Sequence, residues 1–397
     1  MVAGQSLPAG CARGKAPLNH LHMSLSIGNL SPDSCFLNHG QHKSDTDCVI
    51  AAAIVAFWRK PSQALIHLFS VLYKLHDFNK TKVTEFILLA FADIQNLQIL
   101  LFVFVLLTFL SCVVGNSVIL VLVRYERSLH TPMYFFIGTF ALLEIIFVSV
   151  IIPKLLATLI EANRKISFIG CFTQLYAFDS LGVAECYLLV VMAFDRDLAI
   201  NKPLHYCRIM NNALCIELAI VPWIIGCIII SIPTIMTVEL DFCGPNEINH
   251  FLCDFAPLQN LACSNPMISN LVTSSVAAIG STVPFMSILG FYIHIIVLIS
   301  KIKSTRGKKK AFSTCSSHFT VACLFYGSTS IVYVKPKGSQ HDKFLALLYT
   351  VIIPFLNPFI YTLKNKDVKT ALKNTKLVRV LGQIRNRDHH QDHCRYS

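Results

Sequence analysis

Ionisable side chains within long apolar stretches are the residues of this chain with the clearest potential for chemistry. Glu144 and Glu185 each interrupt an apolar stretch, and the side-chain amides of Asn116 and Asn357 stand in two others. Such groups are costly in an apolar medium, so they face the interior of a helix bundle and partner one another. We expect these four side chains to form a shared polar cluster. The plain interpretation of such a cluster is a static hydrogen-bonded plug between helices.

A charged pair, Asp195 and Arg196, stands near the end of another apolar stretch, in the string MAFDRDLAINKPLHY. An ion pair at a helix end can be made or broken when the helix moves, which suits a conformational switch. The alternative is an arginine that snorkels to a membrane surface. The stretches contain no HExxH, no GxSxG and no paired aspartates at facing depth, and the 15 cysteines include no CxxC pair. We therefore predict no enzyme and no metal centre of the zinc type.

The composition places these residues in a membrane. The chain has 397 residues, of which 54% are hydrophobic and 14% are charged, whereas a soluble domain has roughly 25% charged residues. A bilayer core needs about 20 apolar residues in a helix. Seven stretches qualify: residues 97–123, 133–159, 171–191, 214–238, 267–300, 311–334 and 344–363. The predicted fold class is an all-α membrane protein with a bundle of seven transmembrane helices.

Prolines and basic residues add detail to this bundle. Pro153, Pro222, Pro284 and Pro358 lie inside spans, where they predict kinks. Much of the net charge of +12 lies after spans 1, 3, 5 and 7, whereas residues 241–270 contain no Lys or Arg. Because Lys and Arg gather in cytoplasmic loops, we expect an extracellular N-terminus and a cytoplasmic C-terminus. The expected partner of the basic residues is membrane lipid and not nucleic acid.

Two further features agree with that orientation. The sequon at Asn79 precedes the first span, where glycosylation requires an extracellular location. Four cysteines stand in the predicted outer region, where an oxidising exterior permits disulfides: Cys171, Cys243, Cys253 and Cys263. Four cysteines allow three pairings, and free thiols are the alternative.

The ends of the chain do not follow the seven-span pattern. We expect residues 1–75 to be an extension of unknown role, either disordered or an upstream stretch of translated sequence. A ligand-capturing ectodomain is the alternative. Residues 76–374 form the predicted seven-helix domain, and residues 375–397 form a predicted cytoplasmic tail.

Short strings at the ends of the spans carry a family resemblance. They are LHTPMYFF from Leu129, MAFDRDLAINKPLHY from Met192, FCGPN from Phe242, HFLCD from His250, KAFSTCSSHFTV from Lys310 and PFLNPFIYTLKN from Pro354, with Gly115-Asn116 in span 1. In this order they closely resemble the odorant (olfactory) receptor family of rhodopsin-like G-protein-coupled receptors, of the tetrapod-type class. The resemblance runs from about residue 79 to residue 374. It implies a plasma-membrane receptor that binds a small volatile odorant and activates a stimulatory, olfactory-type G protein.

The resemblance also implies roles for particular residues. It selects the disulfides Cys171–Cys253 and Cys243–Cys263, of which the first would fix the second outer loop as a lid. In related receptors a polar cluster like that of Asn116, Glu144 and Glu185 can hold a sodium ion and reorganises on activation. The resemblance therefore implies an activation switch, with the static plug as the alternative, and no other cofactor is expected. The residues implied in G-protein coupling and switching are Asp195, Arg196, Tyr292, Asn357, Pro358 and Tyr361.

This chain departs from the family pattern beside the arginine. Asp195-Arg196-Asp197 stands where the family usually has Asp-Arg-Tyr, and Phe194 replaces another usual tyrosine. We expect the second carboxylate either to strengthen the inactive-state pairing of Arg196 or to disturb the G-protein surface. Glu144 stands in place of the usual aspartate.

The ligand pocket is expected in the outer half of the bundle, between spans 3, 5, 6 and 7. A mostly apolar cavity with a few polar anchors suits a small, largely hydrophobic ligand. Asp179 is the sharpest polar candidate, because it could pair with a cationic or hydrogen-bond-donating ligand. Its alternative partner is a neighbouring helix. The predicted pocket residues are Phe178, Asp179, Gly182, Val183, Tyr326, Ser330, Tyr333 and Thr350.

At the inner side we expect span 6 to swing outwards near Arg196 and the run Lys308–Lys310, and residues 365–374 to form a short interfacial helix. Three alternatives remain. They are a receptor for a non-odorant ligand such as an amine, a transporter or channel, and a receptor that folds but signals poorly because of Asp197. A transporter would show inverted repeats or charges along a continuous path, which this sequence lacks.

Overall fold

The computed structural model describes residues 83–91, 96–160, 164–334, 342–364 and 366–374. The predicted extension, the sequon at Asn79 and the predicted tail lie outside these residues. The side chains of Ser330 and Tyr333, two of the predicted pocket residues, also lie outside the description.

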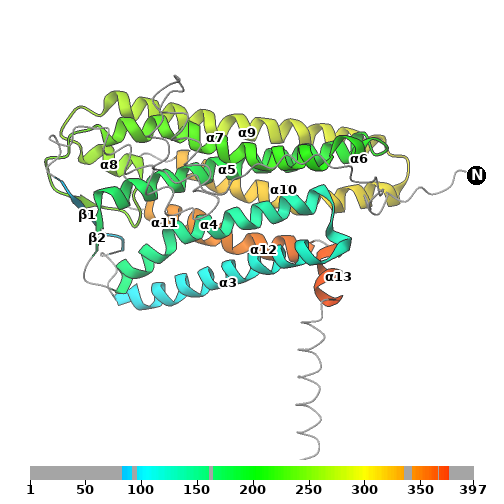
Figure 1. The fold of residues 1–397 in the computed structure, drawn as a ribbon, viewed down its shortest axis with the longest axis horizontal. Helices are drawn as coiled ribbons and strands as arrows, with labels where there is room; N and C mark the ends of the chain where they lie inside the picture. The colour runs from blue at the N-terminus through cyan, green and yellow to red at the C-terminus, as the bar shows by residue number, and fades with distance from the viewer. Residues whose placement is uncertain (1–82, 92–95, 161–163, 335–341, 365, 375–397) are drawn as a thin grey trace, which may run out of the picture.

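Long helices run side by side along the molecule (Figure 1). They are α3 (Gln98–Tyr125), α4 (Pro132–Ile160), α5 (Phe168–Asn201), α7 (Asn212–Val238), α9 (Met267–Lys301) and α10 (Thr305–Val334), followed by a segment that consists of α11 (Asp342–Leu347), the π-helix η4 (Leu348–Ile352) and α12 (Ile353–Lys364). Each covers one of the seven predicted spans. The predicted fold class, a bundle of seven transmembrane helices, is confirmed.

Apolar length supports the membrane assignment. Among the described residues, six segments are long and apolar enough to cross a bilayer, and their windows have mean hydropathies of 1.7–2.6. The remaining helix, α10, has the length of a span, but its apolar part is the shorter stretch His318–Gly327. It nevertheless contacts α5, α9, α11 and α12, so it belongs to the bundle. The outward faces of the other helices are apolar, as at Ile99 and Leu107 of α3, which suits contact with lipid.

Helix α5 is longer than its apolar stretch. The sequence predicts a span that ends near residue 191, whereas the helix continues to Asn201. The additional turns carry Asp195, Arg196 and Asp197, all of which are buried. A hydropathy window ends where charges begin, although the backbone hydrogen bonding of a helix continues past the apolar core of a bilayer.

Helix α5 also lies at the centre of the bundle, where it contacts α4, α7, α9 and α10 (Figure 1). The close approach of α5 and α7 depends on Gly226, because a Cβ at this position would lie 2.2 Å from the Ser180 carbonyl oxygen. Such small residues let membrane helices approach closely without a hydrophobic driving force.

One end of the bundle carries a small sheet of order β2-β1-β3. Strand β1 (Glu85–Leu88) pairs antiparallel with β2 (Lys165–Ser167) and parallel with β3 (Glu247–Ile248). Phe86 of β1 is fully buried, and its ring centroid lies 5.8 Å from that of Phe168 and 5.6 Å from that of Phe242. The segment before the first span is therefore fastened to the two outer loops.

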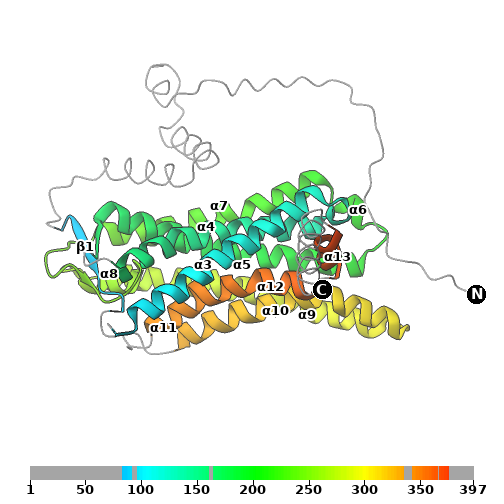
Figure 2. The same cartoon turned by 90° about the horizontal axis from the view of Figure 1, so that it is seen from below.

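The opposite end carries η3 (Arg127–Leu129), α6 (Tyr206–Ile209) and α13 (Lys366–Asn374) (Figure 2). Helix α13 buries Val368 and Ala371 and exposes Lys369. Tyr134 donates a hydrogen bond of 2.9 Å to Asp367 Oδ2 and so ties α13 to the start of α4. The short helix predicted after span 7 is confirmed, and its residues divide between two faces as an interfacial helix requires.

A short helix, α8 (Phe255–Leu261), fastens the second outer loop to the bundle. The buried Gln259 donates hydrogen bonds from Nε2 to the hydroxyls of Thr237, Ser269 and Thr273, over 2.8–3.0 Å. These hydroxyls belong to α7 and α9, so one side chain holds both helices to the loop.

Candidate functional site

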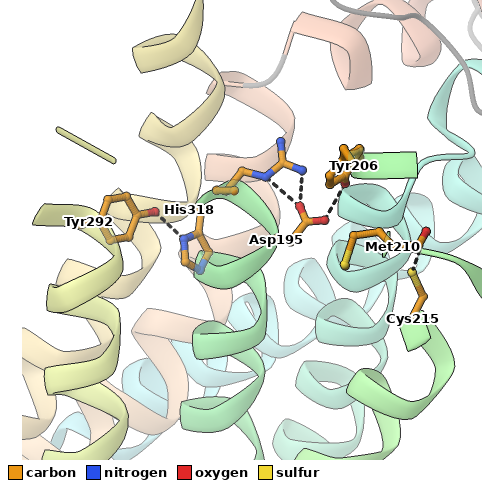
Figure 3. Close-up of polar contacts among 7 residues, drawn as sticks. Asp195, Tyr206, Met210, Cys215, Tyr292 and His318 are labelled. Carbon is orange, nitrogen blue, oxygen red and sulfur yellow. Dashed lines mark hydrogen bonds and ion pairs between the residues drawn. The ribbon is translucent and has the colours of Figure 1, made fainter. Parts of the chain in front are cut away.

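The charged pair at the inner end of α5 is assembled in the structure. Arg196 Nε donates to Asp195 Oδ2 over 2.9 Å, and Nη2 donates to the same oxygen. Tyr206 of α6 donates its hydroxyl hydrogen to Asp195 Oδ1 over 2.6 Å (Figure 3). Both carboxylate oxygens of Asp195 are therefore occupied, and Arg196 is held 8% exposed with its counter-charge. Because Asp195 and Arg196 are neighbours on the same helix, the arginine leaves this arrangement only when its side chain rotates away from the carboxylate.

A second contact of the predicted switch residues lies between α9 and α10. Tyr292 Oη lies 2.5 Å from His318 Nδ1, and their ring planes are stacked (Figure 3). His318, absent from the predicted site, also lines a small cleft beside the arginine. The cleft is lined by Met133, Phe136, Met192, Asp195, Arg196 and His318. The sequence signal for this site was the histidine in KAFSTCSSHFTV, an ionisable residue among mostly small and apolar ones.

Asp197 has a partner other than Arg196 in the structure, and its expected effect on the G-protein surface stays a prediction. Its Oδ1 lies 2.5 Å from His294 Nδ1 on α9. The second carboxylate of the triplet therefore contacts His294 of the neighbouring helix, while Arg196 is paired with Asp195. Sequence reasoning missed His294, because a histidine near the end of an apolar stretch has no distinctive spacing.

The four residues of the predicted polar cluster are all buried, but they are only partly brought together. Asn357 Nδ2 of α12 donates to Glu144 Oε1 of α4. Asn116 instead donates to its own helix, to the Cys112 carbonyl at 3.1 Å. Glu185 is 2% exposed and close enough to Glu144 for their charges to interact. The Glu144–Asn357 contact is thus the interhelical link of the cluster.

Several oxygen atoms around this link are buried with no hydrogen-bond partner among the described residues. They are Glu144 Oε2, Glu185 Oε1, Asn357 Oδ1 and Tyr361 Oη. Buried polar atoms without partners are destabilising, so a proton, a water molecule or a cation is needed to satisfy them. The region has the chemistry of a cation or proton site. Pro358, another predicted switch residue, contacts Gly115, where a Cβ would lie 3.0 Å from the Cβ of the proline.

The predicted pocket residues of α5 lie around a tyrosine that the sequence analysis did not select. A Cβ at Gly182 would lie 3.2 Å from Tyr349 Oη, and the ring of Phe178 lies 5.8 Å from that of Tyr349. Thr350 is buried, and its hydroxyl donates to the Ala346 carbonyl over 2.7 Å. Tyr349 was missed because it belongs to the π-helix, in which an extra residue per turn changes which side chains face the bundle.

Among the other described pocket residues, Val183 and Tyr326 lie between neighbouring helices, whereas Asp179 has a buried oxygen without a partner. Val183 lies against Gly280 of α9. Tyr326 donates to the Cys186 carbonyl over 3.2 Å. Asp179 is one turn outward from Val183, and its Oδ2 is buried without a hydrogen-bond partner among the described residues.

The outer loop covers this end of the bundle. Cys171 pairs with Cys253 and Cys243 pairs with Cys263, the connectivity that the family resemblance implied. Beside the first disulfide, Gln174 Oε1 accepts a hydrogen bond from the Cys253 backbone N–H over 3.1 Å. The loop is thus fixed to α5 by both a covalent bond and a hydrogen bond.

Comparison with known proteins decides the family. The family model described as "Olfactory receptor" matches residues 104–379. Human Olfactory receptor 6N1 is 45% identical over 298 residues, which are 74% of this chain and 96% of that protein. Human Olfactory receptor 10AG1 is 46% identical over 292 residues, or 73% and 97% of the two chains. Mouse Olfactory receptor 6E1 is 44% identical over 306 residues, or 74% and 96%. This chain belongs to the olfactory receptor family.

As an olfactory receptor, the chain is a multi-pass protein of the plasma membrane that responds to odorants through G proteins, and it is not an enzyme. Four of its pocket candidates, Phe178, Asp179, Gly182 and Val183, lie on the same helix as the charged pair Asp195 and Arg196. Asp179 and Arg196 are 17 positions apart on α5, which at about 1.5 Å per residue is roughly 26 Å along the axis. Helix α5 of the receptor therefore connects the two regions directly.

Proposed function

We propose that this receptor binds a small, mostly hydrophobic odorant in the outer half of the bundle, between α5, α9, α10 and the α11–η4 segment. The observation that carries the proposal is the aromatic cluster around Tyr349. The ring centroids of Phe147, Phe178 and Phe325 lie 5.9, 5.8 and 6.4 Å from that of Tyr349. Ligand sites are commonly lined by apolar and aromatic side chains with a few polar groups that fix orientation.

Asp179 is the polar anchor of the proposed site. The hydroxyls of Thr350 and Tyr326 already donate to backbone carbonyls, whereas Asp179 Oδ2 is a buried acceptor without a partner among the described residues. A ligand that donates a hydrogen bond or carries positive charge would satisfy it. The same carboxylate favours the second candidate function, a receptor for a cationic amine ligand outside olfaction.

The inner end is the proposed docking site for a stimulatory, olfactory-type G protein. Arg196 is the group that docking would use, and it is held by Asp195 in the arrangement described above. A movement of the inner end of α10 would disturb the Tyr292–His318 contact and open the cleft beside the arginine. A ligand achieves this only if it binds the two arrangements with different affinity.

Exposed basic residues gather where α9 passes into α10, and they suit anionic membrane lipid as a second partner at this end. Lysine side chains beside a membrane surface each contribute about 1 kcal/mol of attraction to anionic lipid. The residues are Lys301, Lys303, Arg306, Lys308 and Lys309.

A sodium ion in the middle of the bundle is part of the proposal. The four buried oxygens without partners, from Glu144, Glu185, Asn357 and Tyr361, are hard donors of the kind that such a cation takes. When bound, the ion would supply positive charge between two carboxylates. Glu144 and Asn357 would hold it from α4 and α12, so its presence would favour the arrangement in which these helices are linked.

The proposed ligand site is tested with the full chain in cells that express the stimulatory olfactory G protein. Cyclic AMP is recorded across an odorant panel and normalised to surface-labelled receptor. We expect Tyr349→Ala to lower the response to any active odorant at least ten-fold. Phe104→Ala is the matched control, because Phe104 is 42% exposed on α3. A response that survives Tyr349→Ala unchanged, at equal surface level, rejects this location for the pocket.

A further inference from the structure

Two positions at which this chain departs from the family pattern lie on one face of α5. Phe194 and Asp197 are three residues apart, and residues with that spacing are neighbours on a helix surface. Both are directed to α9. The ring centroids of Phe194 and Phe291 lie 5.9 Å apart, and Asp197 Oδ1 lies 2.5 Å from His294 Nδ1. Phe291 and His294 have the same three-residue spacing, so an aromatic pair and a polar pair connect the two helices one turn apart.

The polar pair is independent of the arginine. Asp195 accepts hydrogen bonds from Arg196 and Tyr206, so the arginine has its counter-charge without Asp197. The side chain of Asp197 is 11% exposed and that of His294 is 47% exposed. Histidine Nδ1 can donate to a carboxylate either as a neutral tautomer or as an imidazolium, so the contact is available in both protonation states.

The inner end of α9 is therefore held on two sides. Tyr292 contacts His318 of α10, and His294 contacts Asp197 of α5. Tyr292 and His294 are two positions apart, which corresponds to a rotation of about 200° around a helix. Their contacts therefore lie on opposite sides of α9. They occur together with a buried, paired Arg196, which is the arrangement that G-protein docking must change.

We propose that Phe194 and Asp197 of α5, with Phe291 and His294 of α9, form an interhelical clasp that stabilises the resting bundle and sets the threshold for G-protein activation. This inference rests on the proposed coupling at the inner face. A tyrosine at position 197 would bring no carboxylate to His294, so this carboxylate–histidine contact is a property of this chain and not of the usual triplet. Because His294 is half exposed, its contact with Asp197 contributes only modestly to the free energy of the resting arrangement. The effect is a shift in the balance between the resting and the active arrangement.

The test uses Asp197→Ala, His294→Ala and the double variant in the full chain, with cyclic AMP normalised to surface-labelled receptor. Each single variant is expected to raise basal cyclic AMP about two- to five-fold. The double variant is expected to match the larger single effect, because both changes remove the same contact. Glu217→Ala is the matched control, since it removes an exposed carboxylate near the inner end of α7.

Two results overturn the clasp. One is a basal cyclic AMP level in both single variants that equals the level in Glu217→Ala. The other is a double variant whose effect is the product of the two single effects. If the single variants fail to reach the cell surface, the clasp is tested with an exchange variant that combines Asp197→His with His294→Asp. Recovery of surface level and of basal signal supports the clasp, and an exchange variant no better than the singles rejects it.

Failure of the clasp and failure of the proposed coupling give different results. If Arg196→Ala leaves odorant-evoked cyclic AMP intact, the proposed coupling site is wrong. The clasp is then tested by measuring the thermal unfolding midpoint of the detergent-purified receptor. That midpoint is expected to fall in Asp197→Ala and to remain unchanged in Glu217→Ala, and equal midpoints reject the clasp.

Discussion

Tyr206 donates its phenolic hydrogen to Asp195 Oδ1 over 2.6 Å, from the short helix α6 to the inner end of α5. Asp195 is also the counter-ion of Arg196, so a loop residue and the arginine share one carboxylate. Burial raises the pKa of Tyr206 above its ordinary value, and the negative charge of Asp195 adds to the effect. The phenol therefore keeps its proton at working pH and remains a donor.

We predict that Tyr206→Phe raises basal cyclic AMP about five-fold, because the lost hydrogen bond contributes about 1 kcal/mol to the resting arrangement. Since the pKa is raised, this contribution is fully present below the ordinary tyrosine value of about 10 and is lost only above it. The ratio of variant to wild type should therefore be equal at pH 6.5 and pH 8. Tyr125→Phe, at a residue 79% exposed, is the control. A ratio that changes with pH, or no rise, contradicts the prediction.

Asp179→Asn should change which odorants activate the receptor. A hydrogen bond to a charged group contributes about 1.5–3 kcal/mol, so the response to an amine should fall about ten- to a hundred-fold. An aldehyde of the same chain length needs no acceptor and should keep its potency. Dose–response curves for matched amine and aldehyde pairs measure the difference. An unchanged profile would remove Asp179 from the pocket.

Gly226→Ala should lower the amount of folded receptor at the cell surface. The new Cβ would lie 2.2 Å from the Ser180 carbonyl oxygen, so α5 and α7 would have to separate, at a cost of about 1–3 kcal/mol. Gly290→Ala on α9 is the matched control, because its Cβ would meet nothing within 4 Å. Surface labelling and the thermal midpoint of the purified receptor report the effect. Equal values for the two variants would show that the helices are not in close contact at Gly226.

Sodium should stabilise the receptor through its mid-bundle oxygens. We expect a higher thermal midpoint in sodium chloride than in choline chloride at equal ionic strength, because binding to the folded state alone adds stability. Glu185→Gln should abolish this difference, since it removes one of the two carboxyl groups of the cluster. The measurement needs no odorant or G protein. A midpoint that responds to sodium equally in both proteins would exclude Glu185 as a ligand.

Apolar length and helix-end motifs were enough to predict the seven helical segments. The span predicted at residues 267–300 corresponds to α9 (Met267–Lys301), and that predicted at 214–238 to α7 (Asn212–Val238). The predicted division of α13 between a buried and an exposed face is also present at Val368 and Lys369. These features depend on local sequence, because a bilayer requires about 20 apolar residues wherever a helix crosses it. The disulfide pairing came from the family resemblance, since four cysteines alone left three possibilities.

The tertiary structure alone decided which side chains meet. The sequence suggested Arg196 as a partner of Asp197, whereas the packing of α5 against α9 places Asp197 beside His294. Tyr349 lies in a π-helix, which changes the direction of the side chains in span 7. The spacing of residues in the sequence did not predict this π-helix. The pairing of β1 with two loops also joins segments that are far apart in the chain. The sequence by itself determined where the helices lie, because hydrophobicity is a local property. Helix rotation and contact between distant residues are collective properties of the packed bundle, so they emerged only with the fold.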